Sequence, residues 1–185
     1  MSWNVKPSAT TRIHRRSEPY VTEEMRTRLR EEILPRYAVP QGALLPILHD
    51  IQHRYRHIPH QAMEEVAELL GITSADVLDT VSFYDEFKME ATGRCVIGVC
   101  QSIACEVCGH EAILDHLRGK LDLEVGETSD DGEFTLLAME CLGSCDTAPV
   151  ALFDETLHEG LTIDAIDRLI EKVRQGGGAG EHPHG

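Results

Sequence analysis

The six cysteines of this chain constrain its fold more than any other feature, because all of them lie between Cys95 and Cys145. No apolar segment typical of a signal peptide follows the first methionine, so we expect a chain that is not secreted. In a reducing compartment, clustered cysteines indicate metal or redox chemistry before they indicate disulfides. We therefore predict that this part of the chain folds around a metal or redox site.

Four of the cysteines form two pairs with short spacings. Cys100 and Cys105 follow one apolar run with four residues between them, and Cys141 and Cys145 follow another with three residues between them. Both runs are typical of buried strands, and the ends of adjacent strands meet at one edge of a sheet. We therefore predict that the four thiolates converge. Thiolates suit an iron–sulfur cluster and a structural zinc ion alike, so the spacing leaves both open.

Cys108, which lies outside these two pairs, raises one alternative. Cys105 and Cys108 form a C-x-x-C motif between a predicted strand and a predicted helix, as in dithiol redox enzymes. That interpretation leaves Cys141 and Cys145 without a role, and one short motif is weak evidence. In the simpler interpretation, Cys108 and Cys95 are small apolar residues.

The hydrophobic pattern divides the chain into four parts. Residues 1–21 form a disordered or extended arm, and residues 22–90 show the periodicity of helices. Residues 93–174 alternate between strand and helix patterns, whereas residues 175–185 are a Gly- and His-rich tail with too few apolar side chains to pack. We predict an α+β protein, with a small helical bundle followed by a small α/β domain.

Capping residues set the boundaries of the expected elements. Thr22 and Thr162 are suited to cap the first and last helices, and Gly71 is suited to end the third. The expected helices cover about residues 22–34, 43–57, 61–70, 74–81, 110–117 and 162–173, and the expected strands cover about residues 94–99, 134–139 and 150–153.

The formal net charge of -15 restricts the class of partner. Nucleic-acid binding needs clustered Lys and Arg side chains, so an acidic chain of this kind argues against it. An acidic surface favours a basic protein partner instead. No apolar run approaches the roughly 20 residues that span a bilayer, so we expect no direct membrane insertion.

The residues around the four cysteines resemble a known family. The segments CQSIAC at 100–105 and ECLGSC at 140–145, with Gly109 and Ala148-Pro149, are similar to the thioredoxin-like 2Fe-2S subunit of NADH dehydrogenases, which is the E subunit of respiratory complex I. Related subunits occur in NAD-dependent formate dehydrogenases and bidirectional hydrogenases. The likeness covers about residues 22–174 and includes the helical segments LLPIL and VSFY.

The resemblance implies a fold and a cofactor. The fold would be an N-terminal four-helix bundle followed by a thioredoxin-like α/β domain. The cofactor would be one 2Fe-2S cluster held by Cys100, Cys105, Cys141 and Cys145, with no catalytic residue in the chain. Zinc becomes the weaker alternative.

The same resemblance implies a function and a set of partners. The chain would be an electron-transfer subunit of NADH dehydrogenase (quinone), exchanging single electrons with FMN on a partner subunit that also binds NADH. Further iron–sulfur subunits would complete the complex, at the cytoplasmic side of the inner membrane or in the mitochondrial matrix. The same role in a formate dehydrogenase or hydrogenase is the first alternative, and a zinc-stabilised interaction module is the second.

Overall fold

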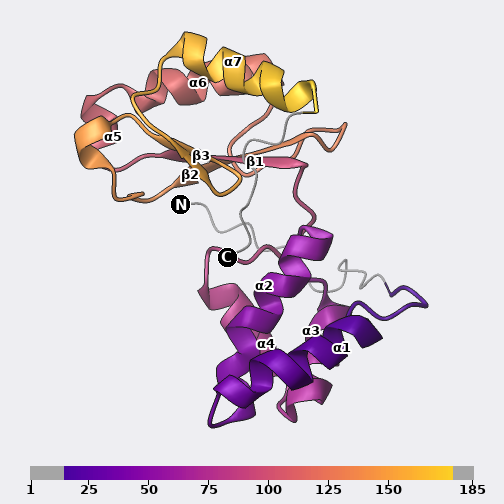
Figure 1. Cartoon of the computed structure of the whole chain (residues 1–185). Helices are drawn as coiled ribbons and strands as arrows, with labels where there is room; N and C mark the ends of the chain where they lie inside the picture. The colour runs from indigo at the N-terminus through magenta and orange to yellow at the C-terminus, as the bar shows by residue number, and fades with distance from the viewer. Residues whose placement is uncertain (1–14, 177–185) are drawn as a thin grey trace. The chain divides into compact units, whose positions relative to one another are not determined.

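A computed structural model describes residues 15–176 of the chain (Figure 1). The chain divides into two compact units between Ala91 and Thr92. The first unit is helical, and the second contains a sheet with helices. The predicted N-terminal arm and C-terminal tail lie mostly outside the described residues.

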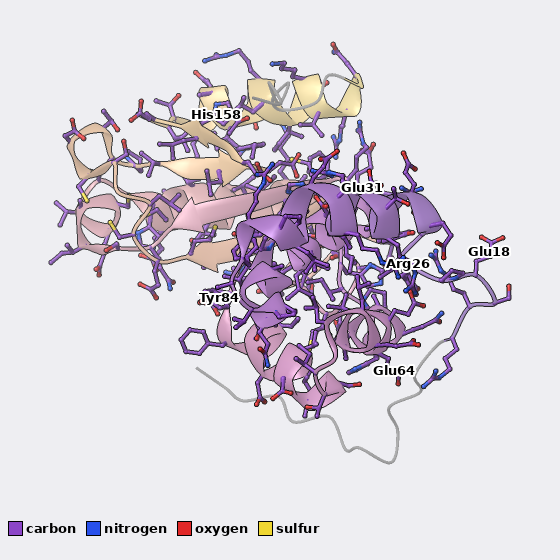
Figure 2. All side chains as sticks on the ribbon, turned by 60° about the horizontal axis from the view of Figure 1, so that its bottom comes forward. Glu18, Arg26, Glu31, Glu64, Tyr84 and His158 are labelled. Carbon is purple, nitrogen blue, oxygen red and sulfur yellow. The ribbon has the colours of Figure 1, made fainter. Side chains whose placement is uncertain are left out.

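The first unit is built from amphipathic helices. Its first helix, α1 (Glu23–Arg28), begins where the sequence predicts, because the Thr22 hydroxyl accepts a hydrogen bond from the Met25 N–H. The elements that follow are a π-helical turn (Leu29–Ile33), two 3-10 turns (Leu34–Arg36 and Pro40–Ala43) and the helices α2 (Leu44–Tyr55), α3 (His60–Leu70) and α4 (Ser74–Phe83). Charged side chains lie on the outside of this unit, and Figure 2 shows Glu18 and Glu31 among them.

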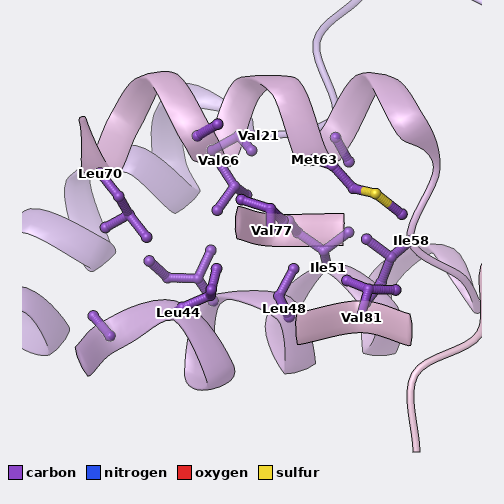
Figure 3. Packing of buried hydrophobic residues seen from close by; sticks show 14 of the residues in the cluster. Val21, Leu44, Leu48, Ile51, Ile58, Met63, Val66, Leu70, Val77 and Val81 are labelled. Carbon is purple, nitrogen blue, oxygen red and sulfur yellow. The ribbon is translucent and has the colours of Figure 1, made fainter. Parts of the chain in front are cut away.

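Apolar side chains at helical spacing form the core of this unit. Ile47 and Ile51 of α2 are fully buried, and so are Val66 of α3 and Val77 of α4. Figure 3 shows how these stripes meet, together with Val21 from the segment before α1. Burying one such side chain stabilises the fold by about 1.5–3 kcal/mol, so this core gives the first unit its own source of stability.

The second unit contains a four-stranded mixed sheet in the order β2-β1-β3-β4. The strands are β1 (Cys95–Cys100), β2 (Phe134–Met139), β3 (Ala151–Phe153) and β4 (Thr156–His158). β1 pairs in parallel with β2 and antiparallel with β3, which forms a hairpin with β4. The sequence predicts the first three strands, whereas β4 lies outside the expected strand ranges.

Three helices complete the second unit, namely α5 (Ile103–Val107), α6 (His110–Leu121) and α7 (Ile163–Arg174). α6 and α7 lie side by side over one face of the sheet (Figure 1), and Asp167 of α7 bonds to His116 of α6 at 2.7 Å. The sequence did not predict α5. Helices with a mixed sheet are the coarse architecture that the resemblance implies for this unit.

The residues that face α6 and α7 alternate along each strand. On β1, Cys95, Ile97 and Val99 belong to the same buried cluster as Ile166 and Ile170 of α7. A period of two is what a strand imposes, so one face of the sheet makes the core.

Among residues 15–176, no helix is long and apolar enough to cross a membrane.

Candidate metal centre

The four paired cysteines lie at one edge of the sheet. Cys100 is the last residue of β1, and Cys141 comes two residues after the end of β2. Because these strands are parallel and Cys100 is in register with Met139, both segments leave the sheet at the same edge. Cys105 lies in α5, just after β1, and Cys145 begins a 3-10 turn (Cys145–Thr147) after β2.

Cys100 and Cys105 form the buried half of the site. Each is 2% exposed, and both pack with Val150 in a small apolar cluster. The backbone holds this half in place, because the Cys100 N–H donates to the Val150 carbonyl at 3.1 Å. Burial raises the pKa of the Cys105 thiol, and the nearby thiols of Cys100 and Cys145 raise it further against a backbone hydrogen bond from Val150.

Cys141 and Cys145 form the exposed half, with their sulfur atoms 3.6 Å apart. The Gly143 N–H donates to the Cys141 Sγ at 3.4 Å, from a backbone with φ of +82° that favours glycine. The hydrogen bond from Gly143 is the largest cause of a lowered pKa of the Cys141 thiol. Hydrogen bonds with Cys145 and with the Ser102 hydroxyl lower this pKa further. The pKa of the Cys145 thiol is raised, chiefly by the neighbouring Cys141.

The two halves approach one another. The Ser102 hydroxyl, which lies between Cys100 and Cys105 in the sequence, lowers the pKa of the Cys141 thiol in the other half. In turn, Cys145 raises the pKa of the Cys105 thiol. Within residues 15–176, no three His, Cys, Asp or Glu side chains form a group suited to one metal ion. A binuclear cluster needs two thiolates for each iron, and two thiol pairs at one sheet edge fit that demand.

The remaining two cysteines lie in different surroundings. Cys95 is 1% exposed within the core between the sheet and the helices, where it acts as a small apolar side chain. Cys108 is exposed at the C-terminal end of α5. The C-x-x-C motif thus joins the buried Cys105 to an exposed thiol.

Sequence reasoning missed a hydrogen-bonded group beside Cys145. The Glu159 carboxylate accepts hydrogen bonds from the Ser144 hydroxyl and, at 2.7 Å, from the Thr147 hydroxyl. These bonds lower the pKa of Glu159, with Ser144 as the first cause and Thr147 as the second. Ser144 and Thr147 flank Cys145 in the sequence, but no motif connects Glu159 to them.

Fold and donor set together define a class, the small ferredoxins that hold a 2Fe-2S cluster in a thioredoxin-like domain. The family model for the thioredoxin-like [2Fe-2S] ferredoxin matches residues 30–174, so the chain belongs to that family. This match confirms the family indicated by the cysteine segments, and with it the 2Fe-2S cofactor.

Two curated relatives carry closely related names. The chain is 38% identical over 149 residues to the second E subunit of NADH-quinone oxidoreductase from Rhizobium meliloti, covering 79% of this chain and 89% of that protein. It is 32% identical over 155 residues to the E subunit of NADH-quinone oxidoreductase from Pseudomonas aeruginosa, covering 84% of this chain and 93% of that protein.

A solved structure is also similar. An NAD+-reducing [NiFe]-hydrogenase in the H2-reduced state matches with a TM-score of 0.65 and 26% identity over 71% of this chain. The match spans only 22% of the hydrogenase chain, so this protein corresponds to one part of it.

Proposed function

We propose that Cys100, Cys105, Cys141 and Cys145 hold one 2Fe-2S cluster, with each pair ligating one iron. The observation that carries this proposal is that two thiol pairs from distant segments meet at one edge of the sheet. When bound, the cluster supplies reversible one-electron transfer. The chain's own residues hold the sulfur atoms and donate backbone hydrogen bonds, as Gly143 does to Cys141.

We further propose that the chain is the electron-transfer subunit of an NADH:quinone oxidoreductase. The names of the curated relatives, which this chain matches over most of their length, support this role. The partner would be a subunit that binds FMN and NADH, accompanied by further iron–sulfur subunits. The complex would keep this subunit peripheral to the inner membrane on the cytoplasmic side, or in the mitochondrial matrix.

The match to a solved structure supports one alternative to this parent complex. The similarity to part of an NAD+-reducing hydrogenase supports the same electron-transfer role in a hydrogenase, and by family resemblance in a formate dehydrogenase. Copurification separates these proposals, because a quinone-reducing complex brings membrane subunits with it, whereas a formate dehydrogenase brings a molybdenum protein.

The domain organisation is also a proposal. We propose an arm at 1–21, whose last residue, Val21, packs into the helical core. A four-helix bundle at 22–90 made by α1 to α4, a thioredoxin-like domain at 93–174 and a tail at 175–185 follow it. The helical core of the first unit and the sheet of the second support this division.

The ligand assignment is tested by serine substitution of single cysteines in the anaerobically purified chain. We expect the dithionite-reduced protein to give the electron paramagnetic resonance signal of a 2Fe-2S cluster. Substituting Cys100, Cys105, Cys141 or Cys145 removes a ligand, so the signal and the acid-labile sulfide should be lost or strongly reduced. Cys108→Ser is the matched control and should keep both.

Two outcomes would contradict the assignment. A colourless protein with stoichiometric zinc and no acid-labile sulfide would favour the zinc-stabilised interaction module. A dithiol oxidoreductase activity that survives Cys141→Ser but is lost in Cys108→Ser would favour the C-x-x-C alternative.

A further inference from the structure

The exposed half of the metal centre needs support that burial does not provide. Cys100 and Cys105 are held in an apolar cluster, but Cys141 and Cys145 are exposed on the segment after β2. Leu142 and Ala148 of this segment pack against the apolar cluster, but the two thiols themselves are exposed and have few packing contacts that fix their directions. Polar contacts must therefore supply the order that the core supplies to the other pair.

One carboxylate makes such contacts on both sides of Cys145. Ser144 precedes this cysteine, Thr147 follows it by two residues, and both hydroxyls donate to the Oε1 atom of Glu159. The two hydroxyls are also 2.9 Å from one another, so the three side chains form a closed group. This group spans the turn that carries the Cys145 thiol.

Backbone hydrogen bonds attach the same two segments. The Gly160 N–H donates to the Thr147 carbonyl at 2.7 Å, and the Leu161 N–H donates to the Pro149 carbonyl at 2.9 Å. Glu159 directly follows β4, so the β3–β4 hairpin brings the carboxylate beside the turn. The acceptor is thus attached to the sheet and does not sit on a free loop.

We propose that Glu159 is a positioning residue for Cys145, which fixes the turn around this thiol by accepting both flanking hydroxyls on one oxygen atom. This inference rests on the proposed cluster. Groups that orient metal ligands without touching the metal typically change metal retention by about 10- to 100-fold when removed. Ordering the exposed half of the site would therefore slow the loss of iron.

The test compares Glu159→Ala with Glu159→Gln in the purified, cluster-loaded full chain. We expect Glu159→Ala to release iron to a chelator about 10-fold faster than the wild type, and to change the g-values of the reduced cluster. Glu159→Gln keeps an oxygen acceptor at the position of Oε1 and loses only the charge, so it should stay within about 2-fold of the wild type. Glu171→Ala removes an exposed carboxylate of α7 and is the charge-matched control.

The donors give an independent comparison. The double variant Ser144→Ala/Thr147→Val should reproduce the faster iron release of Glu159→Ala, and adding Glu159→Ala to it should give no further acceleration, because residues of one network are not additive. If Glu159→Ala does not fold, as judged by far-UV circular dichroism, the double variant and Glu159→Gln carry the test.

Several results would overturn the proposal. These are wild-type iron release and g-values in Glu159→Ala or in the double variant, full additivity of the triple variant, and a Glu159→Gln variant as fast as Glu159→Ala. The last result would assign the effect to charge. A wild type that lacks the 2Fe-2S signal overturns the proposed function itself, whereas a wild type with the signal and an unaltered Glu159→Ala overturns only the role of Glu159.

Discussion

Among single residues, the cysteines show how surroundings decide what one side chain does. Cys95 fills a gap in a core, Cys108 is exposed at a helix end, and Cys105 is buried at the edge where the paired thiols meet. Their types and spacings were visible in the sequence, but their burial was not. The same holds for two glycines, Gly93 and Gly119. The sequence does not distinguish them, but backbone atoms crowd the Cβ position of Gly93 and leave that of Gly119 open.

Among the described glycines, Gly93 is the one whose Cβ would come closest to backbone atoms. A Cβ atom there would lie 2.6 Å from the backbone carbonyl carbon of Phe134, and the Gly93 N–H donates to the buried Thr135 hydroxyl at 2.7 Å. Since the backbone of β2 cannot yield as a flexible side chain does, Gly93→Ala should lower the free energy of unfolding by about 1–3 kcal/mol. Urea unfolding of the full chain, followed by circular dichroism, measures this loss.

Gly119 provides the matched control on the same unit. No atom outside the local helix backbone lies within 4 Å of the position of its Cβ, and the residue is exposed within α6. Gly119→Ala should therefore stabilise the chain by about 0.5–1 kcal/mol, since alanine restricts the unfolded chain and favours helix. Equal effects of the two substitutions would contradict the role assigned to the close approach at Gly93.

Among the elements, the long amphipathic helices follow from the sequence, whereas the short ones do not. α5 has 5 residues and β4 has 3, and neither is among the elements that the sequence predicts. Such lengths are below what periodicity can detect, because a window of about 11–18 residues is needed to distinguish helix from strand. α7 is the opposite case, with Ile166, Ile170 and Val173 buried at helical spacing.

The N-terminal cap of α7 is testable. The Thr162 hydroxyl accepts a hydrogen bond from the Ala165 N–H at 3.2 Å, which satisfies one of the free donors of the first turn. Thr162→Ala should lower the free energy of unfolding by about 1 kcal/mol, and Thr162→Ser should restore most of it. Denaturant titration of both variants decides the matter, and an Ala variant as stable as the Ser variant would rule out a capping role.

At the scale of the whole molecule, the chain combines two cores with a strong excess of acid. Each unit has its own buried cluster, so each has the means to fold around its own apolar residues. The net charge of -15 disfavours compact states through self-repulsion, although it favours solubility and a basic partner. Stability should therefore respond to pH through both repulsion and specific carboxylates.

Three aspartates contribute to the acid side of that response, namely Asp76, Asp131 and Asp167. Hydrogen bonds lower the pKa of each carboxyl group in the folded chain. The first cause is a hydroxyl at Asp76 and at Asp131, and it is the Lys120 side chain at Asp167. Near pH 4 the unfolded chain therefore binds more protons than the folded chain does. These hydrogen bonds stabilise the fold fully above the ordinary aspartate pKa of about 4. Their contribution is lost as the pH falls through the lower pKa values of the folded chain.

Between pH 7 and 5, protonation of histidines weakens repulsion. Burial lowers the pKa of His158, however, so the unfolded chain binds more protons there and this group opposes the gain.

We therefore expect thermal unfolding temperatures that hold between pH 7 and 5 and fall steeply below about pH 4. Asp76→Asn tests one contribution, because the asparagine side chain would keep an oxygen acceptor for the Thr73 backbone N–H but cannot titrate. Its acid slope, followed by circular dichroism, should be shallower than that of the wild type. An unchanged slope would show that the Asp76 carboxylate does not contribute.

The sequence by itself determined the family, the cofactor class, the long helices and the strands of the sheet centre. The helices and strands depend on local patterns, namely capping residues and the periods of buried side chains. The family and the cofactor class rest on the resemblance of the cysteine segments to a known family, because the cysteine spacing alone leaves zinc open. The assignment of the four ligands stays a prediction that the arrangement at the sheet edge supports.

Only the tertiary structure decided which groups surround those cysteines. Parallel pairing of β1 with β2 brings together two segments that are distant in the sequence, and the β3–β4 hairpin carries Glu159 to the hydroxyls beside Cys145. The reason is physical: a hydrogen bond depends on where the chain returns in space, and no local period encodes that return. The burial of Cys100 and the exposure of Cys141 arise in the same way, because Cys100 packs with Cys105 and Val150 in a buried cluster whereas Cys141 lies on the surface.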